Sequence, residues 1–264
     1  MYGGANNGAL CYSGVVPTLN VTVNDNNGNS RTWTYVNNYK NGIPAPSQCL
    51  SQWGCDFTVV ETDPATNQTV HSFVGEYQTQ VASYEGGCPT SITGCRGGGT
   101  LLNTVQTCYG SNGSAPPVPP ACAAPGSVPT LPITERDVYT SFNGGSSNLI
   151  KTTYDNYGNV TSVLRYGFGA TTPASQTYNF YGQSWSGSSC SAYPAGSYIY
   201  DTVCYSHTEN SAGADVSKTQ ITYSNTHHPT RTQQWVSSSN WLTSHATYNP
   251  NGTIETTTDA NGAL

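Results

Sequence analysis

The sequence predicts an all-β protein made of stacked antiparallel β-hairpins, which proline- and glycine-rich loops interrupt. Three observations lead to this prediction. Stretches rich in Thr, Tyr and Val recur along the chain, and such branched and aromatic side chains favour extended strands. Short sequences of the form Asp-x-x-Gly-Asn separate several of these stretches and favour tight turns. No segment keeps the apolar spacing of a helix, so we expect at most a stray helical turn.

The clearest hairpin is Lys151–Arg165, in which Tyr154 closes the first strand. Asp155 and Asn159 supply turn chemistry, because short polar side chains bond to nearby backbone groups. Gly158 can adopt a positive φ without a steric penalty. The local sequence therefore predicts a strand, a Tyr-Asp-x-x-Gly-Asn turn and a second strand.

The same turn recurs in both halves of the chain, with variations. Thr66 and His227 stand where two of the copies should have glycine, and Asp259 starts one more copy near the end. Internal repetition of this kind is stronger evidence about architecture than any single motif. The further copies are marked by Asp25, Gly28 and Asn29, by Asp63 and Asn67, by Tyr223, and by Tyr248 and Gly252.

The motif at Tyr154–Asn159 resembles the signature of RHS/YD-repeat proteins. That family includes bacterial polymorphic-toxin shells, insecticidal toxin-complex components and animal teneurins. The resemblance is strongest over Ser147–Leu264, extends over Leu19–Gln106 and is absent from Tyr109–Leu131. It implies a YD-repeat sheet that curls into a shell or a spiral. The family's self-cleaving aspartyl motif has no match here, so the resemblance implies no protease activity.

The tyrosines of the repeat also have an expected role. By resemblance, Tyr154, Tyr223 and Tyr248 stack between neighbouring repeats, and each glycine allows its turn to close.

Four segments are expected along the chain. They are a flexible lead-in over 1–18, an N-terminal hairpin unit over 19–108, a proline-rich linker or loop over 109–132, and a C-terminal YD-repeat unit over 133–264. Proline cannot donate to a β-ladder, so 109–132 is not expected to form central strand. In order, strands or hairpins are expected over Leu19–Tyr35, Asp56–Val74, Tyr77–Tyr84, Leu101–Tyr109, Thr134–Ser141, Leu149–Leu164, Gln176–Tyr181, Ser197–Ser206, Lys218–Val236 and Leu242–Thr258.

The chain contains nine cysteines, and their spacing indicates in which kind of cellular compartment the protein is found. Eight fall in local pairs around loops rich in Gly, Ser or Pro, where a disulfide could pin strand ends. This usage favours an oxidising, extracellular or cell-surface location, with reduced buried thiols as the alternative. Cys11 is left over. The candidate pairs are Cys49 with Cys55, Cys88 with Cys95, Cys108 with Cys122, and Cys190 with Cys204.

Composition excludes several classes of partner. Charged residues make up 8% of the chain, against about 25% in an ordinary domain. The net charge is −6 with eight Lys and Arg, so there is no basic stripe for nucleic acid. No apolar stretch of roughly 18 residues predicts membrane insertion. The start carries no signal sequence, and with the resemblance this favours an internal piece of a longer chain.

No catalytic constellation is apparent, so we expect neither an enzyme nor a cofactor. Gly182–Gly187 contains Gly-x-Ser but not the Gly-x-Ser-x-Gly of a nucleophile elbow. His227 and His228 are adjacent, and on a strand they would point to opposite faces, so no metal site is expected there. The Asp-rich turns lack the spacing of a calcium loop.

The leading hypothesis is a non-enzymatic structural module of a large secreted or cell-surface protein. Its partners would be flanking repeats of a longer chain or copies of itself, and self-assembly into extracellular fibres is one version. The alternative is an adhesin or glycan-binding β-domain, because aromatic rings stack on sugars. The candidate rings for such binding are Trp33, Trp53, Trp185, Trp235 and Trp241, whose alternative role is packing between repeats.

Overall fold

The computed structural model describes residues 18–24, 27–39, 56–75, 77–110, 129 and 131–260. Within these ranges the protein contains fifteen strands and no helix. The strands are β1 (Leu19–Asn24), β2 (Ser30–Tyr39), β3 (Asp56–Thr62), β4 (Gln68–Val74), β5 (Tyr77–Glu85), β6 (Thr100–Tyr109), β7 (Glu135–Phe142), β8 (Ser147–Tyr154), β9 (Val160–Tyr166), β10 (Ser175–Tyr181), β11 (Val203–Asn210), β12 (Asp215–Tyr223), β13 (Pro229–Ser237), β14 (Asn240–Tyr248) and β15 (Ile254–Thr258).

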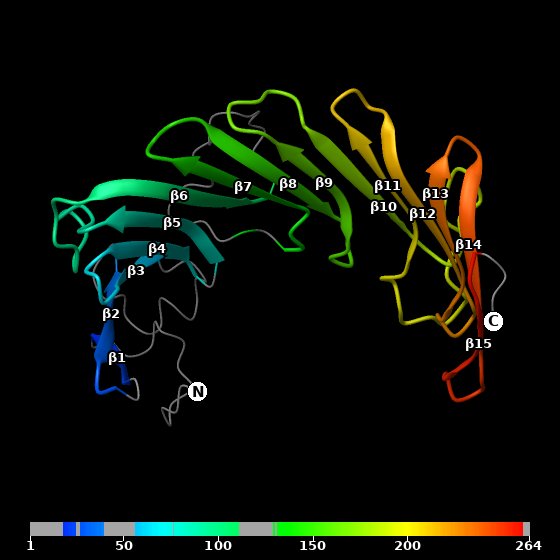
Figure 1. The fold of residues 1–264 in the computed structure, drawn as a ribbon, viewed down its shortest axis with the longest axis horizontal. Coiled ribbons are helices and arrows are strands. Elements are labelled where there is room, and N and C mark those ends of the chain that lie inside the picture. The colour runs from blue at the N-terminus through cyan, green and yellow to red at the C-terminus, as the bar shows by residue number, and fades with distance from the viewer. Residues whose placement is uncertain are drawn as a thin grey trace. The chain divides into compact units, whose positions relative to one another are not determined.

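The order of the strands in the sheet follows their order in the chain, from β1 to β15 (Figure 1). Pairs such as β3 with β4 and β13 with β14 are antiparallel, as a hairpin connection requires. The predicted all-β antiparallel class is therefore confirmed. Since each strand contacts its chain neighbours, the turns between strands decide the register.

The chain divides into two compact units. The first comprises Met1–Leu131 with Arg136–Leu149, and the second comprises Pro132–Glu135 with Ile150–Leu264. The expected lead-in and most of the proline-rich segment lie outside the described residues. The domain boundaries expected from the sequence stay a prediction.

The first unit has a small apolar core. Val60 of β3 and Val70 of β4 are opposite each other in the sheet and are almost fully buried. Cys88 from the loop after β5 completes the cluster, and Val36, Tyr84, Ile92 and Cys95 pack against it. A loop thus covers part of one sheet face, which gives this unit a second layer.

The second unit buries much less. In its described part only Ser162, Gly182 and Cys204 are buried, and the other side chains are half-buried or exposed. Hydroxyl pairs link neighbouring strands instead, for example Thr177 with Thr208 at 3.0 Å. Ladder hydrogen bonds and cross-strand pairs therefore hold this sheet together more than a core does.

The strand prediction for Ser197–Ser206 was wrong in its first half. The sequence predicted extended chain over Ser197–Ser206, but β11 begins only at Val203. The preceding residues form a loop that other segments hold in place. Ser197 Oγ lies 2.8 Å from His227 Nε2, and the Tyr200 hydroxyl donates to the Ser197 carbonyl.

Candidate functional site

One five-residue turn recurs in both units with the same backbone hydrogen bonds. In each copy the amide of position 1 donates to the carbonyl of position 5, and the amide of position 4 donates to the carbonyl of position 1. These distances lie between 2.8 and 3.1 Å. Within the described residues there are five copies, Asp63–Asn67, Asp155–Asn159, Asn210–Ala214, Ser224–His228 and Asn249–Thr253.

Position 4 of every copy has a left-handed backbone. Its φ ranges from 62° at His227 to 84° at Gly158, with Thr66, Gly213 and Gly252 between them. A type I turn followed by such a residue is a common hairpin connection that ends in a β-bulge. The registers shift accordingly beside three of the copies, for example between Thr247 and Tyr248. Gly28 has φ of 81°, as its predicted turn requires, while Asp25 lies outside the described residues.

In four of the five copies, the side chain at position 1 accepts hydrogen bonds across the turn. Asp155 Oδ1 accepts from the amides of Tyr157 and Asn159 at 2.8 and 2.9 Å, and Oδ2 accepts from Asn159 Nδ2 at 2.9 Å. Asp63 and Asn67 repeat the last two bonds at 2.8 and 2.9 Å. Burial alone would raise the pKa of Asp155, but these hydrogen bonds hold it below its usual value.

The copy at Asn210 was not foreseen from the sequence. Asn210 Oδ1 accepts from the amides of Ala212 and Ala214, as Asp155 does in its own turn. This copy has neither the tyrosine before the turn nor the closing Asn, which made it hard to see. The sequence feature that could have identified this turn is Asn210, a residue type that favours turns, three residues before Gly213.

Several tyrosine hydroxyls form hydrogen bonds across the open ends of hairpins. The hydroxyl of Tyr248, the last residue of β14, donates to the carbonyl of Pro229, the first residue of β13, at 2.9 Å. Tyr223 donates to Val203, and Tyr181 to Val160, in the same arrangement. The expected stacking is seen for Tyr248, whose ring lies on that of His228 with centroids 4.7 Å apart. Tyr154 donates its backbone amide to the Thr134 carbonyl.

In the second unit the loop after β10 bridges two repeat turns. Asn159 Nδ2 donates to the Tyr200 carbonyl at 2.7 Å, and the ring of Tyr200 stacks on Tyr157. At its other side, Gln183 Nε2 donates to Asn225 Oδ1 at 2.9 Å. The loop therefore fixes the positions of two turns that are distant in sequence.

The first unit uses a buried amide for a similar purpose. Gln68 is 1% exposed, and its Oε1 accepts from the backbone amides of Cys88 and Arg96 at 3.0 Å each. Its Nε2 donates to Thr62 Oγ1 and to the Gly94 carbonyl. One side chain thus ties the loop between β5 and β6 to the sheet.

Two of the four predicted disulfides are confirmed, Cys88–Cys95 and Cys190–Cys204. Both close the loops just described. Cys108 is disulfide-bonded, and its expected partner Cys122 lies outside the described residues. Cys49 and Cys55 lie outside them as well, as does Cys11.

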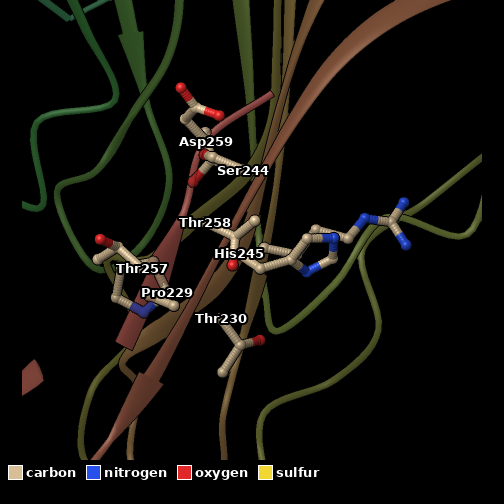
Figure 2. Close-up of a pocket in the computed structure, with 10 residues that line it drawn as sticks. Pro229, Thr230, Ser244, His245, Thr257, Thr258 and Asp259 are labelled. Carbon is tan, nitrogen blue, oxygen red and sulfur yellow. The ribbon is translucent and has the colours of Figure 1, made fainter. Parts of the chain in front are cut away.

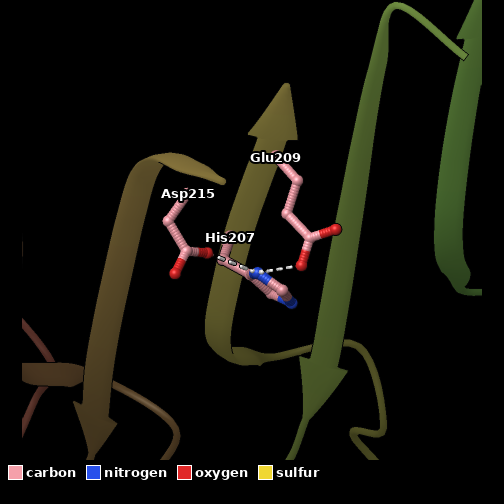
Figure 3. Close-up of side chains that lie close together, drawn as sticks. All are labelled: His207, Glu209 and Asp215. Atoms are coloured by element: carbon pink, nitrogen blue, oxygen red, sulfur yellow. Dashed lines mark hydrogen bonds and ion pairs between the residues drawn. The ribbon is translucent and has the colours of Figure 1, made fainter. Parts of the chain in front are cut away.

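A group of metal-ligating side chains lies on β11 and β12 (Figure 3). His207 Nδ1 lies 3.0 Å from Asp215 Oδ1 and 3.7 Å from Glu209 Oε1, so one nitrogen and two carboxylate oxygens converge. These residues could offer three ligands to a divalent cation. Lys218 Nζ, however, lies 2.6 Å from Asp215 Oδ2, and its hydrogen bond lowers the pKa of Asp215. One of the two carboxylates of this cluster is therefore already paired with a lysine.

A shallow pocket of about 260 Å³ lies on β13, β14 and β15 (Figure 2). Hydroxyl groups of Thr230, Ser244 and Thr258 line it together with His245 and Asp259. It contains a single carboxylate, so it lacks the opposed acid pair of a glycoside hydrolase. No helix in the described part of the chain is long and apolar enough to cross a membrane.

Comparison of the sequence with protein-family models and with curated proteins finds no match.

Proposed function

We propose that this chain is a non-enzymatic structural β module of the YD-repeat type, within a large secreted or cell-surface protein. The observation that carries this proposal is the five-residue turn, which recurs in both units with the same hydrogen bonds. A binding or catalytic site needs one special arrangement of side chains. Here the sequence repeats a single arrangement that closes hairpins.

The strand order supports a scaffold that grows in one direction. Each hairpin adds its strands beside the previous one, as in repeat proteins, where neighbouring repeats supply most of the contacts. In the described part of the chain, β1 and β15 each pair with one strand only. Edge strands of this kind accept further strands. The partners would then be flanking repeats of a longer chain or copies of this one.

The two disulfides and the low charge support the proposed location. Disulfides persist in oxidising compartments, and both confirmed bonds close exposed loops. With 8% charged residues, the surface relies on Ser, Thr, Asn and Tyr for its solubility.

Light scattering coupled to size-exclusion chromatography tests the proposal over a range of protein concentrations. Strand addition predicts a mass that rises reversibly with concentration. Lysine on an edge strand hinders pairing, so Val21→Lys on β1 and Thr256→Lys on β15 should lower that mass. Asn156→Lys is the matched control, because it adds the same charge in an exposed turn. A constant monomer mass, or association that neither edge variant reduces, would contradict pairing between copies through these edges.

A further inference from the structure

A continuous group of aromatic rings covers one face of the second unit. Tyr178 and Phe180 of β10 lie opposite His207 and Tyr205 of β11. The ring centroids are 5.1 Å apart for the first pair and 5.7 Å for the second. Trp185, from the loop after β10, stacks on Tyr205 at 4.2 Å. We refer to these five residues, together with Trp235 of β13 and Trp241 of β14, as the aromatic face.

The aromatic face continues across the next three strands. His207 lies opposite Lys218 of β12, and Lys218 Nζ lies 5.2 Å from the ring centroid of Trp235 on β13. Trp235 in turn lies opposite Trp241 of β14. From β10 to β14 there are four strand spacings of about 4.8 Å, or roughly 19 Å. Such a length fits an extended ligand better than a single small molecule.

Polar groups that can both donate and accept lie between the two ends. Tyr205 lies opposite Gln220, which lies opposite Gln233 on β13. Gln233 Nε2 donates to Thr243 Oγ1 of β14 at 3.0 Å. Because side chains two residues apart share a face, this row runs beside Trp235 and Trp241. Amides and hydroxyls are the groups that recognise ligand hydroxyls.

The charges along the face nearly cancel. Glu209 and Asp215 are close to His207, while Lys218 pairs with Asp215 and Arg231 donates to Gln233 Oε1. An anionic or a cationic ligand would thus find no excess of opposite charge. This balance favours a neutral ligand.

The position of Trp185 is fixed by its loop. Trp185 forms a β-bridge with Cys190, and Cys190 is disulfide-bonded to Cys204, the neighbour of Tyr205. A ring held in this way needs little ordering when a ligand binds, which improves affinity. Leu242, an exposed aliphatic side chain nearby, lies opposite Gln234 and alternates with Trp241, so it projects from the opposite face.

We propose that the aromatic face from Phe180 and Trp185 to Trp241 binds a neutral oligosaccharide or polysaccharide chain. Sugar rings stack their apolar faces on Trp and Tyr, and their hydroxyls bond to the Gln row. A protein partner would be expected to use an exposed aliphatic side chain such as Leu242, which points away. This binding does not depend on the scaffold role, because it needs only the second unit.

Native affinity electrophoresis tests the proposal with the full chain. Gels contain hydroxyethyl cellulose, laminarin or xylan as neutral polymers, and alginate as an anionic one. At least one neutral polymer should retard the wild-type protein, and alginate should not. Trp185→Ala and Trp241→Ala should each weaken retardation about tenfold, since each removes one stacking ring. Trp33→Ala, in the first unit, and Leu242→Ala, beside Trp241 on the opposite face, should leave it unchanged.

Three results would overturn the proposal. They are no retardation by any neutral polymer, equal retardation by alginate, and retardation that survives both Trp185→Ala and Trp241→Ala. Far-UV circular dichroism confirms that each variant is folded. If Trp185→Ala does not fold, Trp241→Ala still decides, because its ring lies outside the disulfide-closed loop.

Discussion

At position 4 of the repeat turn, a side chain strains the backbone, because this position has a positive φ. Thr66 has φ of 70°, although its branched Cβ disfavours left-handed geometry. Gly158 has φ of 84° at the equivalent place, and a Cβ there would meet nothing within 4 Å. At Gly158 the cost of a side chain therefore comes from its own backbone and not from crowding.

A pair of substitutions tests this cost. Thr66→Gly should raise the free energy of unfolding by about 0.5–1 kcal/mol, because relief of strain exceeds the added chain entropy. Gly158→Ala should lower it by about 1 kcal/mol. Urea denaturation measures both. A destabilising Thr66→Gly would show that the threonine contributes something other than strain.

Asp155 should make the stability of its turn depend on pH. Its pKa is lowered in the folded protein, so its charge stabilises the fold above the ordinary Asp pKa of 3.8. That contribution is lost as the pH falls through the folded pKa. Asp155→Asn should cost about 0.5–1 kcal/mol at pH 7 and nothing once wild-type Asp155 is protonated.

Urea denaturation from pH 7 down to pH 2 checks this prediction. Asn210 shows that Asn can occupy position 1, so the variant should keep its turn. A difference between wild type and variant that stays constant over the whole pH range would rule out the carboxylate as its source.

At the level of elements, the loop between β5 and β6 and the loop after β10 are each held by a few polar groups. Gln68 makes four hydrogen bonds, three of which reach the loop between β5 and β6. Gln68→Met keeps the approximate volume but leaves buried backbone groups without that partner. We expect a loss of about 3 kcal/mol or more. Chemical denaturation measures it, with Gln234→Met on exposed β13 as the control, expected within about 0.5 kcal/mol.

The Gln68→Met variant should also make the Cys88–Cys95 disulfide more accessible to a reductant. With the loop loosened, Cys88–Cys95 should be reduced faster by dithiothreitol, while Cys190–Cys204 in the other unit keeps its wild-type rate. If both bonds reacted at wild-type rates, Gln68 would not be what holds the loop.

Sequence reasoning succeeded where the interactions are local. The hairpin around Asp155 could be predicted because its hydrogen bonds join residues no more than four apart. It failed where contacts are distant, as for the loop before Val203, which bonds to partners 41 residues away at Asn159 and 30 away at His227. No local pattern encodes such contacts. The sequence offered Trp185, Trp235 and Trp241 as candidate rings, but it could not show that they share one side, because strand register and the loop after β10 bring them together.

At the scale of the whole molecule, the two units differ in what stabilises them. The first has a buried cluster around Val60 and Val70, whereas the described part of the second has few buried side chains. Both nevertheless contain the same turn, although its sequence varies from Asp-Pro-Ala-Thr-Asn to Asn-Ser-Ala-Gly-Ala. We infer that this turn is the repeated unit of the protein.

Amide hydrogen exchange followed by NMR tests that claim most directly. The amides at positions 1 and 4 donate hydrogen bonds within every turn, so they should exchange slowly in all five copies. The second-position amides of Asn156, Ser211 and Asn225 donate none in the described geometry and should exchange fast. Slow exchange confined to the copy at Asp155, or equal rates at positions 2 and 4, would contradict the claim. The fourth-position amides to follow are those of Thr66, Gly158, Gly213, His227 and Gly252.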